Sequence, residues 1–432
     1  MTGWAPTRAL GRAVLVTGLL LVAAVLLGRI DLVVLAVPFA VGTAVALSRR
    51  PAGAPLVDLT VADPDVAEGE PVAATVSVDN PDPVGYDVVV LRTHVSPWLT
   101  AAAPERPVVL RLAPTGSADH LLATEALRWG RHLVGPASAR VTACDGLIGH
   151  TSVVSPARSV RVYPVTEPFR ADEAMPRAAG LVGAHRSRRP GEGGELAGVR
   201  VFGPGDRLRR IDWRVSLRAR QLHVAATLSD RDAEVVLLLD LLAEAGRSGG
   251  IRGASSVLDT TVRAAAAIGE HYLHQGDRVS MLEYGPRARR LRPAAGRRQY
   301  LTLLDWLLDV RALPYEYEPD DELSGPQLLS SNALVVVLTP LIDPRSAGML
   351  ARLARAGRFV VAVDTLPPTA SPDPSDPLMT VAHRLWCLDR DNTIGQLREH
   401  GVPVVAWAGT GSLDQVLRDV ARMAVAPRAV LR

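Results

Sequence analysis

Arginine and acidic residues crowd into one short stretch, residues 198–214, which is the most specific signal of the chain. Arginine carries a planar fork of hydrogen-bond donors that stays charged at physiological pH, so a cluster of arginines can bind carboxylate or phosphate groups. The residues that carry the signal are Gly205, Asp206, Arg207, Arg209, Arg210, Asp212, Trp213 and Arg214. They suggest either a docking surface for an anionic partner or headgroup, or a joint between two domains.

We predict the structural role for the acidic and aromatic members of this stretch. Asp206 and Asp212 are expected to pair with neighbouring arginines. Ile211 and Trp213 are expected to be buried, because a tryptophan among satisfied polar groups suits a buried anchor. The outer arginines are the better candidates for contact with a partner: Arg214, Arg218 and Arg220.

A second group of candidate residues lies where apolar strands are expected to end. Asp240 closes one apolar run, and Thr339 and Asp343 follow another. In an open α/β sheet, ligands bind at the carboxyl ends of the strands. A hard cation there needs several oxygen ligands, but Leu242 and Glu244 stand where hydroxyl residues would be needed. We therefore expect a degenerate site and no cofactor, with a Mg²⁺ ion at Asp240, Thr339 and Asp343 as the minor alternative.

The chain holds two cysteines, Cys144 and Cys387, which is too few for a disulfide framework. Cys144 and His150 could form a thiol–imidazole pair, which would make the chain a thiol-dependent hydrolase or transferase. However, the sequence around Cys144 is typical of a turn, and free cysteines are more often buried and inert. No catalytic residue is predicted, and the roles of both cysteines stay open.

Charge and composition narrow the class of protein. Arginine supplies all of the basic charge, because the 432 residues contain no lysine, and the formal net charge is only +3. That balance gives no strong case for nucleic-acid binding. Aromatic residues make up 4% of the chain, so its cores must consist mainly of Val, Leu and Ala.

Two apolar runs without charged residues open the chain, residues 13–27 and 32–47. Flanking residues can lengthen each run to the roughly 20 residues that a membrane-spanning helix needs, so we predict a transmembrane helical hairpin within residues 1–50. The alternative is a cleaved signal peptide, but its apolar region would be more than twice the usual ~7–15 residues. By the positive-inside rule, flanking arginines place both ends of the hairpin and the soluble domains in the cytoplasm. These arginines are Arg8, Arg12, Arg49 and Arg50.

The remaining chain changes its pattern twice. Residues 55–164 alternate between apolar and polar positions, with turn signals about every ten residues, which predicts an immunoglobulin-like β-sandwich. Residues 165–230 are a connecting segment, irregular up to residue 194, that contains the arginine-rich stretch. Residues 231–432 alternate apolar strands with amphipathic helices, which predicts a parallel α/β sheet with helices on both faces. Its expected strands are residues 235–240, 278–284, 334–338, 359–364 and 402–407, and its expected helices are residues 255–275, 297–310, 345–356, 392–400 and 413–425.

Gly205-Asp206-Arg207, followed by Arg210-Ile211-Asp212-Trp213, resembles the signature of the domain of unknown function 58 family. In that family, the signature lies just ahead of a von Willebrand factor A-like domain with a Rossmann-like α/β fold, and two N-terminal membrane spans are usual. The resemblance implies a partner of a MoxR-type AAA+ ATPase, often beside a transglutaminase-like membrane protein, and no established enzymatic activity. A frequent metal motif of the family, Asp-x-Ser-x-Ser, is not kept after Asp240.

We therefore expect a membrane-anchored scaffold or adaptor for protein–protein interaction, and not an enzyme. Its expected role is in the maturation or assembly of envelope or other protein complexes. Two alternatives stay open: the thiol-dependent hydrolase or transferase at Cys144, and a secreted adhesion module, which requires cleavage of the N-terminal segment.

Overall fold

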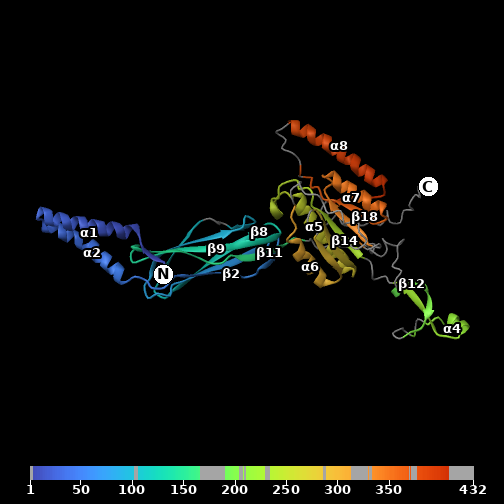
Figure 1. Cartoon of the computed structure of the whole chain (residues 1–432), viewed down its shortest axis with the longest axis horizontal. Helices are drawn as coiled ribbons and strands as arrows, with labels where there is room; N and C mark the ends of the chain where they lie inside the picture. Colours follow the sequence, from blue (N-terminus) through green and yellow to red (C-terminus); the bar gives the residue numbers. More distant parts are fainter. Residues whose placement is uncertain are drawn as a thin grey trace. The chain divides into compact units, whose positions relative to one another are not determined.

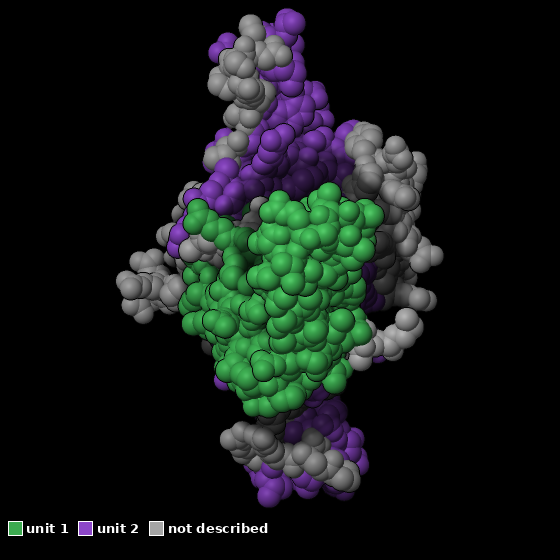
Figure 2. All heavy atoms as spheres, turned by 90° about the vertical axis from the view of Figure 1, so that its left-hand side faces the viewer, with its two compact units in different colours: residues 1–163 green, residues 164–432 purple. Residues whose placement is uncertain are grey.

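The computed structural model separates into two compact units, Met1–Tyr163 and Pro164–Arg432 (Figure 2). The structure describes residues 3–101, 106–165, 190–203, 208, 211–228, 234–285, 289–312, 329, 333–368, 370 and 377–407. The helix predicted for residues 413–425 lies outside this described part.

Unit 1 begins with two apolar helices, α1 (Arg8–Leu27) and α2 (Ile30–Ser48), which lie side by side (Figure 1). Thr7 caps α1 by accepting a hydrogen bond from the Leu10 amide, and Gly28 ends the helix with a φ of 64°. Glycine adopts this left-handed conformation without steric cost, so it allows the tight turn into α2. Both helices are long and apolar enough to span a membrane, which confirms the predicted pair of N-terminal apolar helices.

Two β-sheets make up the rest of unit 1. The first has the strand order β2-β4-β8-β6, and the second has the order β1-β10-β9-β11-β3, with β5 paired to β9 and β7 paired to β5. The strands of the first sheet are β2 (Leu56–Val61), β4 (Pro71–Asp79), β6 (Leu99–Ala101) and β8 (Ser117–Ala126). Those of the second are β1 (Trp4–Pro6), β3 (Asp65–Ala67), β5 (Tyr86–Val95), β7 (Val108–Leu112), β9 (Gly130–Ala143), β10 (Ile148–Val154) and β11 (Arg158–Tyr163).

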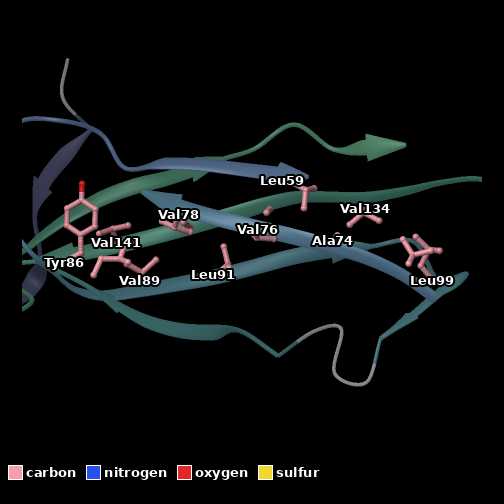
Figure 3. Close-up of a cluster of buried hydrophobic side chains, with 14 of the residues drawn as sticks. Leu59, Ala74, Val76, Val78, Tyr86, Val89, Leu91, Leu99, Val134 and Val141 are labelled. Carbon is pink, nitrogen blue, oxygen red and sulfur yellow. The ribbon is translucent and has the colours of Figure 1, made fainter. Parts of the chain in front are cut away.

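The alternation of side chains along these strands produces one core between the two sheets. Val76 and Val78 of β4 are fully buried, whereas the residues beside them in the strand are partly exposed. They share a hydrophobic cluster with Leu91 and Val141 of the second sheet (Figure 3). Successive residues of a strand point to opposite faces, so this period of two is what the sequence predicts for a half-buried sheet. The β-rich character of this region is therefore confirmed.

Strand β1 fixes the helical hairpin to the β-sheets of unit 1. Trp4 pairs with His150 across β1 and β10, and its side chain is only 3% exposed. The Trp4 indole Nε1 donates a hydrogen bond to the Gly53 carbonyl at 2.6 Å, and the Arg50 guanidinium donates to the Trp4 carbonyl at 2.5 Å. Asp82 accepts from the Gly53 amide at 3.0 Å. The chain entering α1 and the chain leaving α2 are thus bonded to each other and to the same domain.

A six-stranded sheet forms the centre of unit 2, in the order β16-β15-β14-β17-β18-β19. All neighbouring pairs are parallel except β15 and β16. Counted along the chain, the order is 3-2-1-4-5-6, and it reverses between β14 and β17. Both of these strands are buried at every residue, and both are apolar except at their ends, where Glu234, Asp240 and Thr339 stand. The bounds are β14 (Glu234–Asp240), β15 (Arg278–Tyr284), β16 (Arg290–Ala294), β17 (Leu334–Thr339), β18 (Phe359–Asp364) and β19 (Val404–Ala406).

Helices cover both faces of this sheet. Leu238 of β14 shares a core with Leu350 of α7 (Pro344–Arg355) and Leu397 of α8 (Pro377–Glu399). Leu237 points to the other face, where α5 (Val257–His274) packs against α6 (Arg297–Leu307). Gly269 of α5 allows this close approach of α6, because a Cβ there would lie 2.6 Å from the Leu303 side chain, closer than packed atoms can come. Helix α8 begins at Pro377 and is much longer than the predicted helix of residues 392–400.

The arginine-rich stretch lies in a small substructure of unit 2. Strands β12 (Pro190–Val201) and β13 (His223–Leu228) pair antiparallel, and the short helix α4 (Trp213–Ala219) lies between them in sequence. We call β12, α4 and β13 the signature module. The expectation of an irregular chain up to residue 194 is wrong for residues 190–194, which belong to β12. The glycines of this strand leave no alternation of apolar and polar side chains, so the sequence does not indicate a strand. The strand forms through backbone hydrogen bonds, which do not require that alternation.

We expect the substitution Trp4→Ala to open the β1–β10 junction. It removes a buried indole and its hydrogen bond, a change that typically costs about 3–5 kcal/mol. Hydrogen exchange of the full chain in detergent measures this: the Thr151 amide, which donates to the Gly3 carbonyl, exchanges much faster in the variant. Trp213→Ala is the matched control, since Trp213 is exposed. Unchanged protection at Thr151 contradicts the proposed role of Trp4.

Candidate functional site

Three polar residues line up where three parallel strands end. The strand register places Asp240 of β14 beside Thr339 of β17, and Thr339 beside Asp364 of β18. The Thr339 Oγ1 donates a hydrogen bond to Asp240 Oδ2 at 2.6 Å. This is the edge of the sheet at which α/β proteins bind ligands, and it includes the point where the strand order reverses.

Asp240 is a buried carboxylate whose oxygens are both engaged. It is 2% exposed, and its second oxygen accepts a hydrogen bond from the Leu242 amide at 3.2 Å. Burial raises the pKa of Asp240 above the ordinary value of a carboxyl group, and the hydrogen bonds oppose this only in part. Thr339 is also satisfied, because its Oγ1 accepts from the Leu341 amide at 3.1 Å. Asp240 and Thr339 therefore hydrogen-bond to each other and to nearby backbone amides.

Asp343 serves the start of helix α7. Its side chain accepts from the Arg345 amide at 2.9 Å and forms an ion pair with the Arg345 guanidinium at 2.6 Å. Burial alone would raise the pKa of Asp343, but the hydrogen bonds and charge of Arg345 hold it below the ordinary value. Asp343 thus acts as a helix cap with its own counter-ion.

The carboxylates at this edge already have partners within the chain. Leu242 is buried, and the Glu244 carboxylate accepts a hydrogen bond from the Leu258 amide at 3.1 Å. Asp240 and Asp343 are occupied as described above. In the part of the chain that the structure describes, no group of three His, Cys, Asp or Glu residues is placed to hold a metal ion. Hard cations need several convergent oxygens. The carboxylates described at this edge are engaged in hydrogen bonds or ion pairs, whereas the hydroxyl of Ser346, beside Asp240, is buried without a hydrogen-bond partner.

Sequence reasoning missed the ion pair that closes this edge. Asp364 and Arg390 of α8 lie 2.6 Å apart and are both largely buried. Arg390 also donates to the Pro340 carbonyl at 3.0 Å. Asp364 ends an apolar strand as Asp240 does, and that position was the available signal. The arginine on a distant helix could not be paired with it from sequence.

The two cysteines are placed differently. Cys144 has a φ of 56°, consistent with the predicted turn, and its thiol donates to the Arg49 carbonyl at 3.5 Å. Burial raises the pKa of the Cys144 thiol, which disfavours the thiolate that a nucleophile requires. The Nδ1 of His150 lies 2.6 Å from the Thr151 carbonyl. Cys387 lies on α8, with its Sγ 3.5 Å from His383 Nε2.

Five residues of the predicted signature lie outside the described residues: Gly205, Asp206, Arg207, Arg209 and Arg210. The predicted pairing of Asp212 with neighbouring arginines stays a prediction, because Arg207, Arg209 and Arg210 lie outside the described residues. Asp212 is the N-cap of α4, and its side chain accepts from the Val215 amide at 3.1 Å. Ile211 is buried and forms a β-bridge with Val224.

Trp213 is not buried as predicted. Its side chain is 63% exposed, because the cap at Asp212 places it at the first position of α4, on the solvent side of the helix. Leu217, four residues on, is 78% exposed and shares that face. Arg214 and Arg218 are exposed on the adjacent face. We call these four residues the α4 surface.

Comparison with known proteins gives a family and no activity. The family model described as "Protein of unknown function DUF58" matches residues 198–381. The chain is similar to the uncharacterized protein Mb1516 of Mycobacterium bovis, with 28% identity over 258 residues, covering 58% of this chain and 73% of that protein. The uncharacterized protein Rv1480 of Mycobacterium tuberculosis matches with the same identity and coverage.

Solved structures show only slight likeness. The CARDB domain of the PF1109 protein from Pyrococcus furiosus, in complex with di-metal ions, aligns with a TM-score of 0.20 and 13% identity, covering 26% of this chain and 88% of that one. A chain from the human complex of Zinc 2-glycoprotein and Prolactin inducible protein aligns with a TM-score of 0.20 and 13% identity, covering 25% of this chain and 93% of that one. Neither likeness is close enough to support an argument about fold or function.

We expect Asp240→Asn to stabilise unit 2 increasingly as pH rises. Because the pKa of Asp240 is raised in the folded chain, the wild type loses stability as pH rises from the ordinary value of 3.8 through the folded pKa. The asparagine carries no charge to bury, so its melting temperature should exceed the wild-type value more at about pH 8 than at about pH 4.

Thermal melts with Mg²⁺ and with a chelator complete this test. Neither addition should shift the melting temperature of the wild type or of Asp240→Asn. A stabilisation by Mg²⁺ that disappears in the variant would show that Asp240 is a metal ligand.

Proposed function

We propose that this chain, which matches the model of the DUF58 family of unknown function over residues 198–381, is a membrane-anchored adaptor that binds a protein partner through the α4 surface. The observation that carries this proposal is the exposure of Trp213 and Leu217 beside two arginines on a capped helix. Tryptophan and arginine are enriched where binding energy concentrates in protein interfaces.

The chemistry of the α4 surface suits an acidic partner. Arg214 and Arg218 are one helical turn apart, and each can form a two-pronged contact with a carboxylate. Trp213 and Leu217 supply apolar area to be buried at the centre of a contact. The resemblance in the signature motifs names a MoxR-type AAA+ ATPase as this partner, with a transglutaminase-like membrane protein as a further member of the assembly.

The fold of unit 2 supports a binding role. The strand order 3-2-1-4-5-6 and an aspartate at the end of the first strand are consistent with a von Willebrand factor A-like domain of Rossmann-like type. Because the carboxylates of Asp240 and Asp343 are engaged within the chain, we propose that the partner contact is metal-free. For unit 1, we propose that the two-sheet domain is immunoglobulin-like.

We further propose that both soluble units lie in the cytoplasm. Helices α1 and α2 are joined by the short turn Gly28–Arg29, and arginines flank their outer ends. An adaptor for a cytosolic ATPase requires this topology, whereas a secreted adhesion module requires the opposite side. The raised pKa of the Cys144 thiol is unfavourable for the thiol-dependent enzyme.

We expect a reporter fused after Arg432 to lie on the cytoplasmic side of the membrane. A green fluorescent protein fusion should be fluorescent and remain with the membrane fraction, and an alkaline phosphatase fusion should be inactive. An N-terminal tag should stay on the full-length chain. Active phosphatase, or loss of the tag by cleavage, contradicts the adaptor and supports the secreted module.

Charge reversal on the α4 surface tests the docking role. We expect Arg214→Glu with Arg218→Glu to reduce recovery of an AAA+ ATPase, in pull-downs from solubilised membranes, by roughly tenfold or more, because like charges facing each other cost several kcal/mol. Arg297→Glu with Arg298→Glu is the matched control, since these are exposed arginines at the start of α6.

The control variant should recover the ATPase as the wild type does, and circular dichroism should be the same for all three proteins. Wild-type recovery by the α4 double variant would contradict docking at this surface. Recovery of no ATPase by the wild type would contradict the proposed partner.

A further inference from the structure

Helix α8 lies beside α7 on the outside of its own domain (Figure 1). It carries an exposed apolar face in addition to the face that packs on the domain. On the inner face, Leu397 belongs to the core of unit 2, and Arg390 pairs with Asp364. On the outer face, Val381, Leu385 and Leu388 are respectively 55%, 63% and 62% exposed. Leucine and valine side chains left this far in water are costly unless something covers them.

The spacing of the outer residues is that of a coiled-coil seam. Leu378, Val381, Leu385, Leu388 and Asn392 follow one another at intervals of three, four, three and four residues. The seven positions of a coiled-coil heptad are labelled a to g, and positions a and d face the partner helix. In this stripe, Leu378, Leu385 and Asn392 occupy position a, and Val381 and Leu388 occupy position d. Face-packing helices of globular domains usually show a broader apolar face than this narrow one.

We propose that α8 pairs in parallel with α8 of a second copy of this chain. Two features of the stripe favour a second copy running in the same direction. The first is Asn392, because a single asparagine at an a position meets its own copy only in a parallel, in-register pair and thereby specifies that register. The second is a pair of opposite charges at the positions that flank the stripe.

Arg384 lies at a g position and Asp389 at the following e position, and both are exposed. In a parallel pair, a g residue faces the e residue five positions further along the other helix, so Arg384 faces Asp389 of the second copy. The contact occurs twice by symmetry. The second copy therefore offers both the apolar area and the complementary charge that the stripe needs.

The seam is short, and this predicts where the pair forms. It spans about two heptads, and isolated helices shorter than ~12–15 residues are marginal in water. Two chains anchored in the same membrane are held at a high effective concentration, which compensates for a weak contact. The pair should therefore be present in membranes and dissociate in dilute detergent. This inference uses the membrane anchorage of the proposed function and makes no use of the ATPase.

Cross-linking in native membranes tests the pairing. In a background with Cys144→Ser and Cys387→Ser, Leu385→Cys should form a disulfide-linked dimer on mild oxidation, because a positions of the two helices face each other. Arg298→Cys, at an exposed position of α6, is the matched control and should stay monomeric. No dimer above this control overturns the proposal.

A charge swap tests the register. Arg384→Glu and Asp389→Arg should each reduce the cross-linked fraction of Leu385→Cys several-fold, and the double variant should restore it. A cross-linked fraction that these charge changes leave unaltered overturns the parallel pairing. The pairing is also overturned if a Val381→Cys chain cross-links to a Leu385→Cys chain more readily than two chains with the same cysteine cross-link to each other.

The competing occupant of the stripe is the segment of residues 413–425 in the same chain. A disulfide between Leu385→Cys and Leu417→Cys within one chain, in place of the dimer, would show that this segment covers α8 and would overturn the proposal. Loss of ATPase recovery with an intact dimer would instead contradict only the adaptor role.

Discussion

The hydrogen bond from Thr339 to Asp240 is the contact on which the arrangement of the carboxyl edge of the unit 2 sheet depends. It joins the ends of two neighbouring parallel strands at the point where the strand order reverses, which is where proteins of this architecture place their ligands. In this chain, the hydrogen bond engages the Thr339 hydroxyl and one Asp240 carboxylate oxygen, which a ligand at this edge would otherwise contact. Asp343 is held by Arg345, and Asp364 is held by Arg390, so each of the three carboxylates of this edge has a partner within the chain.

Two exposed surfaces of unit 2 follow from local structure. The N-cap at Asp212 starts α4 so that Trp213 points to solvent, and a basic, apolar contact surface results. The bond between Arg390 and Asp364 holds one face of α8 on the domain and leaves its opposite, heptad-spaced face outward. A local helix cap in α4 and an ion pair with the domain in α8 determine which side chains remain available. In unit 1, Trp4 has the corresponding role, because it couples the hairpin to the β-sheets.

The sequence predicted the elements whose burial leaves a clear pattern of apolar residues. The strand β18 (Phe359–Asp364) was predicted to the residue, and the apolar hairpin was identified by its composition alone. It was insufficient where backbone pairing or long-range contact decided the structure. Strand β1 has three residues, too few for a pattern, and β12 is hidden by glycines. For Trp213, residue type suggested burial, but the position relative to a helix cap determined its exposure. The role of the signature as a domain joint stays a prediction.

The central claim is that the α4 surface contacts a protein partner. Site-specific photo-cross-linking in living cells tests it most directly, with a photoreactive amino acid in place of Leu217 and, as a control, in place of Leu301, an exposed leucine of α6. We predict an adduct from position 217 that contains an AAA+ ATPase, and none from position 301. An adduct with lipid alone at position 217, or the same proteins from both positions, would contradict the claim.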